Sequence, residues 1–132
     1  MLSALASERE LRLWLDDDLE DRAAPDGWAH TTTVAQTVAA LDTGRVIALS
    51  LDNDLGDDLL YGQGIHVIDF ICQQQVQAQR LLWPREGITI HSANAVARDQ
   101  MTRAINRYAG EVLRVHSSMT SGGKRHFAFQ TS

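Results

Sequence analysis

Acidic side chains gather in two short stretches of this sequence, one between residues 16 and 26 and one between 52 and 58. Each stretch directly follows an apolar, strand-like segment. Carboxylates brought together at strand ends repel one another, and a cation between them relieves that repulsion. Carboxylate oxygens are also the ligands that hard divalent cations prefer. We therefore expect Mg²⁺ or Mn²⁺ to be held by Asp16, Asp17, Asp52 and Asp54. The structural alternative is a pair of solvated acidic loops.

A second group of polar side chains follows the apolar segment 88–90. His91 could transfer a proton, because an imidazole titrates near neutral pH. Ser92 and Asn94 could donate hydrogen bonds to a phosphate oxygen. Each interpretation has a structural alternative, which is a buried, hydrogen-bonded histidine for His91 and capping of the following helix for Ser92 and Asn94.

Three cations could complete an anion site. Arg22 lies inside the first acidic stretch, where it could bind a phosphate or form a salt bridge within its loop. Lys124 and Arg125 follow a pair of glycines, from which they could reach the same crevice or extend into solvent. Trp14 is expected in the core. With these residues we predict a site in which His91, Asp52 and Asp54 are catalytic and Arg22, Ser92 and Asn94 hold phosphate.

The apolar pattern predicts strands that alternate with helices. Each strand is followed by a polar tip, and ligands of parallel α/β sheets bind at the carboxyl ends of the strands. We therefore expect the tips 16–18, 52–54, 91–94 and 117–124 to meet in one crevice. The predicted strands are 11–15, 28–32, 46–51, 88–90 and 112–116, the helices are 34–41, 65–82 and 95–108, and 126–130 is a further edge strand.

This alternation predicts an α/β fold of three layers, with helices on both faces of a mainly parallel five-stranded sheet. The arrangement is receiver-like, or flavodoxin-like, with a shortened first helix. We expect one domain, residues 1–132, and homodimers could form if the last strand paired with its copy.

Composition narrows the function classes. The chain has 132 residues, 44% of them hydrophobic, and a formal net charge of −5, so disorder is excluded and broad DNA binding is not expected. We find no signal peptide and no apolar run near the roughly 20 residues of a membrane span. A cytoplasmic protein without membrane partners is therefore expected.

The acid pair Asp16–Asp17, an acceptor-like Asp52 or Asp54, and Ser92 resemble the receiver domain of two-component systems. That resemblance implies Mg²⁺ at the acid pair and a phosphoryl group on the acceptor. The segment 113–117 departs from it, because it lacks the lysine that completes a receiver site.

A receiver-like family named for proposed cyclic-phosphate processing is more similar. The motifs that carry this resemblance are Leu13-Trp-Leu-Asp-Asp17, Arg22, Pro25-Asp-Gly-Trp28, Ser50-Leu-Asp-Asn-Asp-Leu-Gly56 and His91-Ser-Ala-Asn94. Together they span roughly residues 11–105. Asn53 departs from the family pattern, which often has histidine there.

The family resemblance implies a phosphoesterase-like role on cyclic phosphate ends of RNA or of nucleotides, with RNA repair as one context. A phosphorylated nucleotide or RNA end is then the expected ligand. Two alternatives stay open: a phosphate-binding module without catalysis, and a signalling receiver phosphorylated on Asp52 or Asp54.

Overall fold

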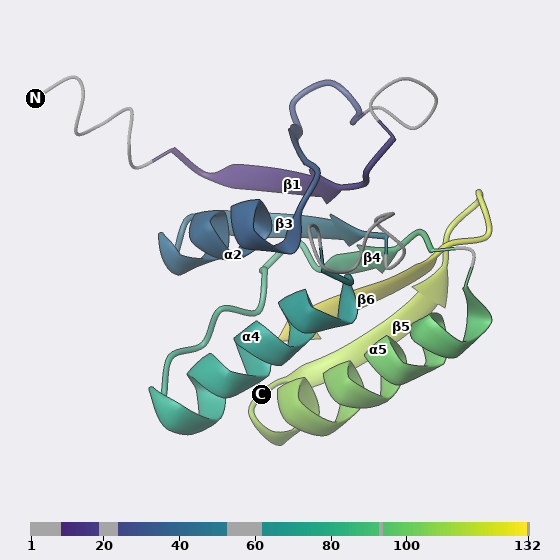
Figure 1. Ribbon diagram of the computed structural model, residues 1–132. Helices are drawn as coiled ribbons and strands as arrows, with labels where there is room; N and C mark the ends of the chain where they lie inside the picture. The colour runs from purple at the N-terminus through teal and green to yellow at the C-terminus, as the bar shows by residue number, and fades with distance from the viewer. Residues whose placement is uncertain (1–8, 19–23, 53–61, 93, 132) are drawn as a thin grey trace, which may run out of the picture.

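The computed structural model describes residues 9–18, 24–52, 62–92 and 94–131. These residues form one six-stranded sheet and three α-helices (Figure 1). No helix in these four ranges is both long enough and apolar enough to cross a bilayer. The elements are β1 (Leu11–Leu15), β2 (Ala29–Thr31), α2 (Val34–Asp42), β3 (Val46–Leu51), α4 (Ile65–Gln77), β4 (Ile88–Ile90), α5 (Ala95–Tyr108), the short 3-10 helix η1 (Ala109–Glu111), β5 (Arg114–Met119) and β6 (Arg125–Gln130).

The sheet has the strand order β2-β1-β3-β4-β6-β5. Strands β2, β1, β3 and β4 run parallel, whereas β6 is antiparallel to both β4 and β5. The receiver-like α/β prediction is therefore confirmed, with a parallel centre and an antiparallel edge. The carboxyl ends of β1, β3 and β4 meet at one edge of the sheet, where the polar tips were expected.

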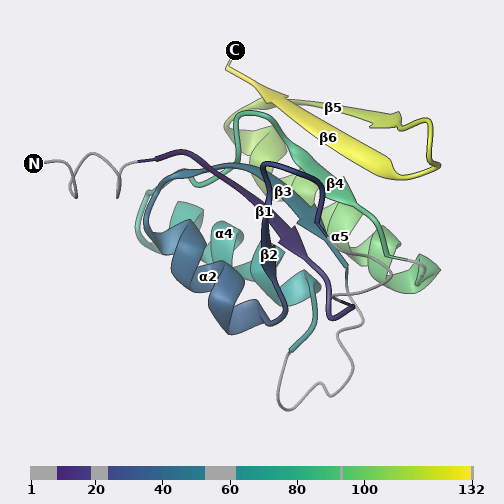
Figure 2. The same cartoon turned by 90° about the horizontal axis from the view of Figure 1, so that it is seen from above.

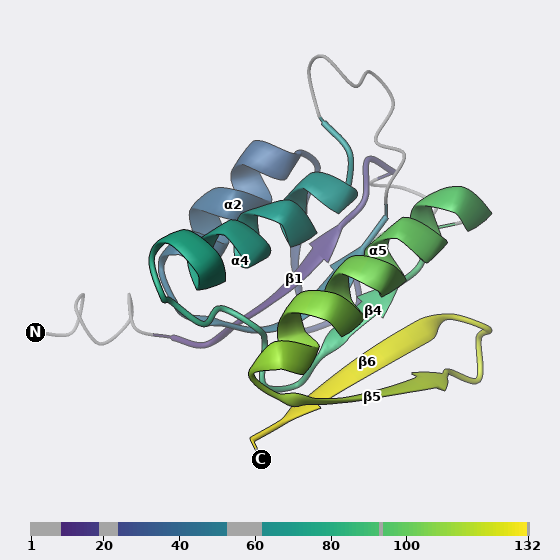
Figure 3. The ribbon, with the colours of Figure 1, turned by 90° about the horizontal axis from the view of Figure 1, so that it is seen from below.

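The three α-helices lie together on one face of the sheet (Figures 2 and 3). The connections β2-α2-β3 and β3-α4-β4 both lead toward the β4 side of the sheet. Because such crossovers are right-handed, both helices lie on the same face of the sheet. Helix α5 packs beside α4. Helices on the second face of the sheet were predicted as well, and the described residues contain none there. The described residues between β1 and β2 hold no helix, and the last element is a hairpin.

The six strands agree with the five predicted strands and the further strand at 126–130, but that last strand does not lie at the edge of the sheet as predicted. Strand β6 lies between β4 and β5, so both of its edges are paired within the chain and cannot pair with a second copy. Strand β6 takes the inner position because it carries the apolar side chains. Phe127 is fully buried and Phe129 is 9% exposed, whereas most of β5 is exposed. Pairing with β6 also shifts β5 from the predicted 112–116 to Arg114–Met119.

Alternation along the strands forms the core. The strand side chains that enter the core stand at every second position of their strands, and they are 9% exposed or less. Helix α2 begins where the Thr33 hydroxyl accepts a hydrogen bond from the Gln36 amide at 3.1 Å. Helix α4 ends at Gln77 rather than at residue 82, because Gln79 adopts a positive φ of 53°. The sheet contributes Leu13, Leu15, Leu49, Leu51, Ile88, Ile90, Phe127 and Phe129 to the core.

Gly87, just before β4, has very little room for a side chain. Its φ is +95°, and an added Cβ would lie 2.3 Å from the Phe127 carbonyl oxygen and 2.7 Å from His126 Nε2. Backbone strain and overpacking each cost about 1–3 kcal/mol. We therefore expect Gly87→Ala to lower the free energy of unfolding by about 3 kcal/mol or more in urea denaturation.

Two other glycines are controls for the Gly87 prediction. A Cβ at Gly110 meets nothing within 4 Å and needs no positive φ, so Gly110→Ala should be close to neutral. Gly123 has an open environment and a φ of +78°, so Gly123→Ala isolates the cost of the backbone conformation. If Gly87→Ala costs no more than Gly123→Ala, the close approach of β6 to Gly87 does not constrain the sheet as we describe.

Candidate functional site

The site is built on three strand ends in register. Leu15 of β1 pairs with Leu51 of β3, and Leu51 pairs with Ile90 of β4. The next residue on each strand is Asp16, Asp52 and His91. The ladder continues to them, because the Asp52 amide donates to the Leu15 carbonyl at 2.9 Å and the His91 amide donates to the Leu51 carbonyl at 2.9 Å. Neighbouring strands lie about 4.8 Å apart, so the three side chains form one row.

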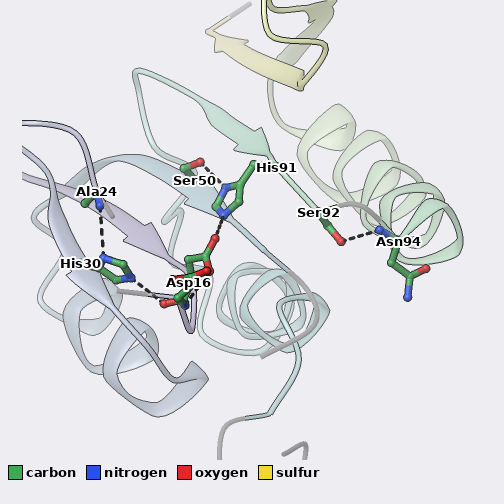
Figure 4. A network of polar contacts seen from close by, with 8 residues as sticks. Asp16, Ala24, His30, Ser50, His91, Ser92 and Asn94 are labelled. Carbon is green, nitrogen blue, oxygen red and sulfur yellow. Dashed lines mark hydrogen bonds and ion pairs between the residues drawn. The ribbon is translucent and has the colours of Figure 1, made fainter. Parts of the chain in front are cut away.

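Asp16, Asp52 and His91 form a compact group of metal-ligand type. One ligand atom of each lies within 4.8 Å of the others. Asp16 is fully buried and Asp52 is 3% exposed. Figure 4 shows His91 pointing at Asp16, with Nε2 of the imidazole 3.1 Å from the Asp16 Oδ2 atom. Of the residues the structure describes, these form the only cluster of this kind.

The His91 ring is held on three sides. Its Nδ1 lies 2.7 Å from the Ser50 hydroxyl, so its two nitrogens lie between a hydroxyl and a carboxylate. One ring face stacks on Trp14, with centroids 4.5 Å apart and planes within 11° of parallel. The side chain is 2% exposed. This environment fixes the direction of Nε2, as hydrogen bonding to the other nitrogen commonly does for a histidine that binds metal or moves a proton.

Asp16 is fixed through its backbone and its carboxylate. Its amide donates to the Thr31 carbonyl at 3.0 Å, and its Oδ1 atom accepts from the Asp18 amide at 2.9 Å. His30 accepts from the Ala24 amide at Nδ1, so its Nε2 carries the proton and donates to the Asp16 carbonyl at 2.6 Å. Strand β2 and its flanking loop therefore hold Asp16 in place (Figure 4).

Residues 11–107 match the family model of the cyclic-phosphate processing receiver domain. The chain belongs to this family. No significant match was found to a curated protein or to a solved structure. The matched residues of this cyclic-phosphate processing receiver domain include β1, β3 and β4, and therefore the whole Asp16, Asp52 and His91 group. The β5–β6 hairpin lies beyond the match.

The remaining predicted metal ligands differ in position. Asp17 is exposed and stands outside the group, because successive residues of a strand alternate between faces. Asp54 lies outside the described residues, as does Arg22. Of the four carboxylates expected to act together, the structure brings Asp16 and Asp52 into one group with His91.

Ser92 and Asn94 lie on the α5 side of His91, apart from the Asp16 group (Figure 4). The Asn94 carboxamide accepts from the Ala97 amide at 3.0 Å and caps α5. The Ser92 hydroxyl accepts from the Asn94 amide at 3.1 Å. The capping interpretation is therefore confirmed for Asn94, and Ser92 shapes the turn before the cap.

Two residues of the site were not singled out as functional. Trp14 was expected in the core, yet it stacks on His91, and Ser50 holds the imidazole. A sequence signal existed, because each stands two positions before a site residue on its own strand. Alternation with a period of two puts Trp14 on the face of Asp16, and Ser50 on the face of Asp52.

Lys124 reaches the site from the hairpin. Its ammonium lies 4.9 Å from the centre of the Trp14 ring, which in turn stacks on His91. The segment 113–117 has no lysine, but Lys124, directly before β6, lies at the same edge of the sheet. The expectation that Lys124 could reach the crevice agrees with this position.

The single cysteine takes no part in this chemistry. Cys72 lies on α4 in the core, and burial raises the pKa of its thiol to about 12. A thiol with such a pKa is protonated near neutral pH and is a weak nucleophile. The chemistry of the site therefore rests on carboxylates and imidazole.

Proposed function

We propose that this chain is a metal-dependent phosphoesterase acting on cyclic phosphate ends of RNA or of nucleotides. The observation that carries the proposal is the buried row of Asp16, Asp52 and His91, in a chain that belongs to the cyclic-phosphate processing receiver family. Two carboxylates and an imidazole within 4.8 Å supply both charge and a titratable nitrogen.

The donor set fits a divalent cation. Asp16 and Asp52 would hold it, and the other two predicted ligands, Asp17 and Asp54, would add carboxylates. Carboxylate oxygens suit Mg²⁺ and Mn²⁺, and a neighbouring imidazole favours Mn²⁺ of the two. When bound, such an ion would neutralise phosphate charge and polarise the phosphorus–oxygen bonds.

The chain's own residues would move the proton and hold the anion. Opening a cyclic phosphodiester adds a water oxygen to phosphorus, breaks one of the two ester bonds of the ring and returns a proton to the ribose oxygen. His91 would transfer that proton at Nε2, the nitrogen held toward Asp16. Lys124 would neutralise phosphate charge at the rim, together with Arg22 and with the hydrogen-bonding groups of Ser92 and Asn94.

The direct test is turnover of adenosine 2′,3′-cyclic phosphate by the purified protein. Chromatography measures the conversion. We expect a single adenosine monophosphate isomer with Mn²⁺, slower conversion with Mg²⁺, and no conversion in EDTA. A single isomer is expected because one geometry of attack breaks one of the two ester bonds.

The same assay separates the two alternatives. Stoichiometric binding of the cyclic nucleotide without conversion would replace the enzyme with a phosphate-sensing module. Stable labelling of Asp52 or Asp54 by a small phosphodonor such as acetyl phosphate would instead support a signalling receiver. A chain that neither binds nor converts the nucleotide contradicts the proposed function.

A further inference from the structure

A pocket of about 410 Å³ lies between the first turns of α5 and the β5–β6 hairpin. None of its lining residues belongs to the Asp16, Asp52 and His91 group. Pockets of this size are typical of small-ligand sites. Its lining combines two guanidinium groups, a carboxylate, a hydroxyl and one thioether, on Ala95, Arg98, Asp99, Thr102, Met119, Gly123 and Arg125.

Two arginines, Arg98 and Arg125, give the pocket its positive charge. Arg98 donates from Nη1 to the Ser92 carbonyl at 2.9 Å, which fixes the guanidinium and leaves its other N–H groups available. Arg125 has no carboxylate partner in the described part of the chain, although it is partly buried. Guanidinium groups bind phosphate with charge-assisted, often paired hydrogen bonds. A partly buried arginine without an acidic partner is therefore suited to an anion.

The carboxylate of the pocket is largely neutralised by another residue. Asp99 pairs with Arg103 one turn along α5, at 2.8 Å. The pair leaves the charge of Arg98 and Arg125 in excess at the pocket. Met119 is 56% exposed and supplies an apolar surface beside them. An anion that carries an apolar ring system fits this combination better than inorganic phosphate does.

The pocket also lies at the same edge of the sheet as the proposed catalytic group. Arg98 bonds to the carbonyl of Ser92, the residue that follows His91. We propose that this pocket is a second phosphate subsite, which binds the phosphate of the nucleotide next to the reacting end. This inference rests on the proposed function, and it names the substrate class as an oligonucleotide end rather than a lone nucleoside cyclic phosphate. The hairpin that builds it lies outside the residues matched by the family model.

The test titrates the protein with adenosine 5′-monophosphate in the absence of metal. Binding is measured by the chemical shifts of the ¹⁵N-labelled backbone amides. We expect shifts centred on Thr102, Gly123 and Arg125. Arg98→Gln and Arg125→Gln should each weaken binding about tenfold or more, because each removes charge-assisted hydrogen bonds. Asp99→Asn should strengthen binding only slightly, because Arg103 already pairs with the Asp99 carboxylate.

Matched controls make the result specific. Arg107→Gln removes an exposed arginine of the same helix, outside the pocket, and should leave the affinity unchanged. Arg125→Lys should retain part of the binding. Inorganic phosphate should bind more weakly than the nucleotide, because it makes no contact with Met119. Unchanged affinity in both Arg98→Gln and Arg125→Gln overturns the subsite.

The design also separates this inference from the proposed function. The probe binds without metal, so a protein that turns over no cyclic phosphate can still bind it in the pocket. If Asp16→Asn with Asp52→Asn changes the affinity for the probe as much as Arg98→Gln does, the nucleotide occupies the acidic group and the subsite is wrong. In the active enzyme, Arg125→Gln should raise the KM about tenfold for a cyclic phosphate that also carries a 5′-phosphate, and should leave the KM for adenosine 2′,3′-cyclic phosphate unchanged.

Discussion

Replacing both buried carboxylates, Asp16→Asn with Asp52→Asn, should weaken Mn²⁺ binding at least 100-fold in calorimetric titrations. The two carboxylates provide the negative charge of the Asp16, Asp52 and His91 group. A divalent ion is stripped of water only where charged oxygens replace it. Asparagine keeps the shape of each side chain and removes the charge, so the variant should fold while losing the site.

Thermal unfolding gives an independent measure of the same prediction. A ligand at 100 times its Kd stabilises the native state by about 2.7 kcal/mol. For a chain of 132 residues this corresponds to a rise in Tm of roughly 5–12 °C. The wild type should show that rise with Mn²⁺, and the double variant should show none. Comparable Mn²⁺ affinities in the two proteins would contradict the metal site.

Three single variants provide the comparison for the metal prediction. Asp26→Asn removes an exposed carboxylate from the turn before β2 and should leave Mn²⁺ affinity unchanged. Asp17→Asn should weaken it less than Asp16→Asn, because Asp17 is exposed and stands outside the group. Asp54→Asn tests the remaining predicted ligand.

His91→Ala should lower kcat at least 100-fold while changing Mn²⁺ affinity less than tenfold. A positioned general acid or base contributes about 10²- to 10⁴-fold to a rate. The imidazole contacts the Ser50 hydroxyl at Nδ1 and faces Asp16 at Nε2, a geometry that suits the proposed role. Asp16 and Asp52 remain to hold the metal. Undiminished turnover would remove His91 from the mechanism, and a parallel loss of Mn²⁺ binding would make it a ligand instead.

His126 offers a closely matched control for the His91 prediction. It lies on β6, and its Nδ1 lies 2.7 Å from the Thr89 hydroxyl, the same distance as His91 Nδ1 from Ser50. It lies outside the Asp16, Asp52 and His91 group. His126→Ala should therefore retain turnover. Ser50→Ala should lower kcat less than His91→Ala and shift the pH profile of kcat, because Ser50 positions the imidazole without touching the substrate.

The sequence determined the central strands of the sheet and the polar residues at their carboxyl ends. The apolar runs 11–15, 46–51 and 88–90 coincide with β1, β3 and β4. The run 46–51 is buried along its whole length, as expected of a central parallel strand, whereas 11–15 and 88–90 are buried mainly at every second position. The residue after each run is then a strand-end residue. Asp16, Asp52 and His91 could be predicted for this reason, before any knowledge of how the strands pair.

Sequence could not separate Asp16 from Asp17. Adjacent residues of a strand point to opposite faces, so one of the pair enters the group and the other does not. The register of β1 against β3 makes this choice: Leu15 pairs with Leu51, which brings Asp16 level with Asp52. Register depends on contacts between segments far apart in the chain, and no local pattern encodes it.

Tertiary structure alone decided the surroundings of the site. Lys124 reaches Trp14 because β6 folds back between β4 and β5, a choice made by the burial of Phe127 and Phe129. The same fold-back brings Arg125 to the pocket that Arg98 also lines. Local sequence thus fixed which residues end the strands, since hydrophobic periodicity is a local property. The assembled sheet decided which of them meet, since pairing order and register arise from burying the whole chain together.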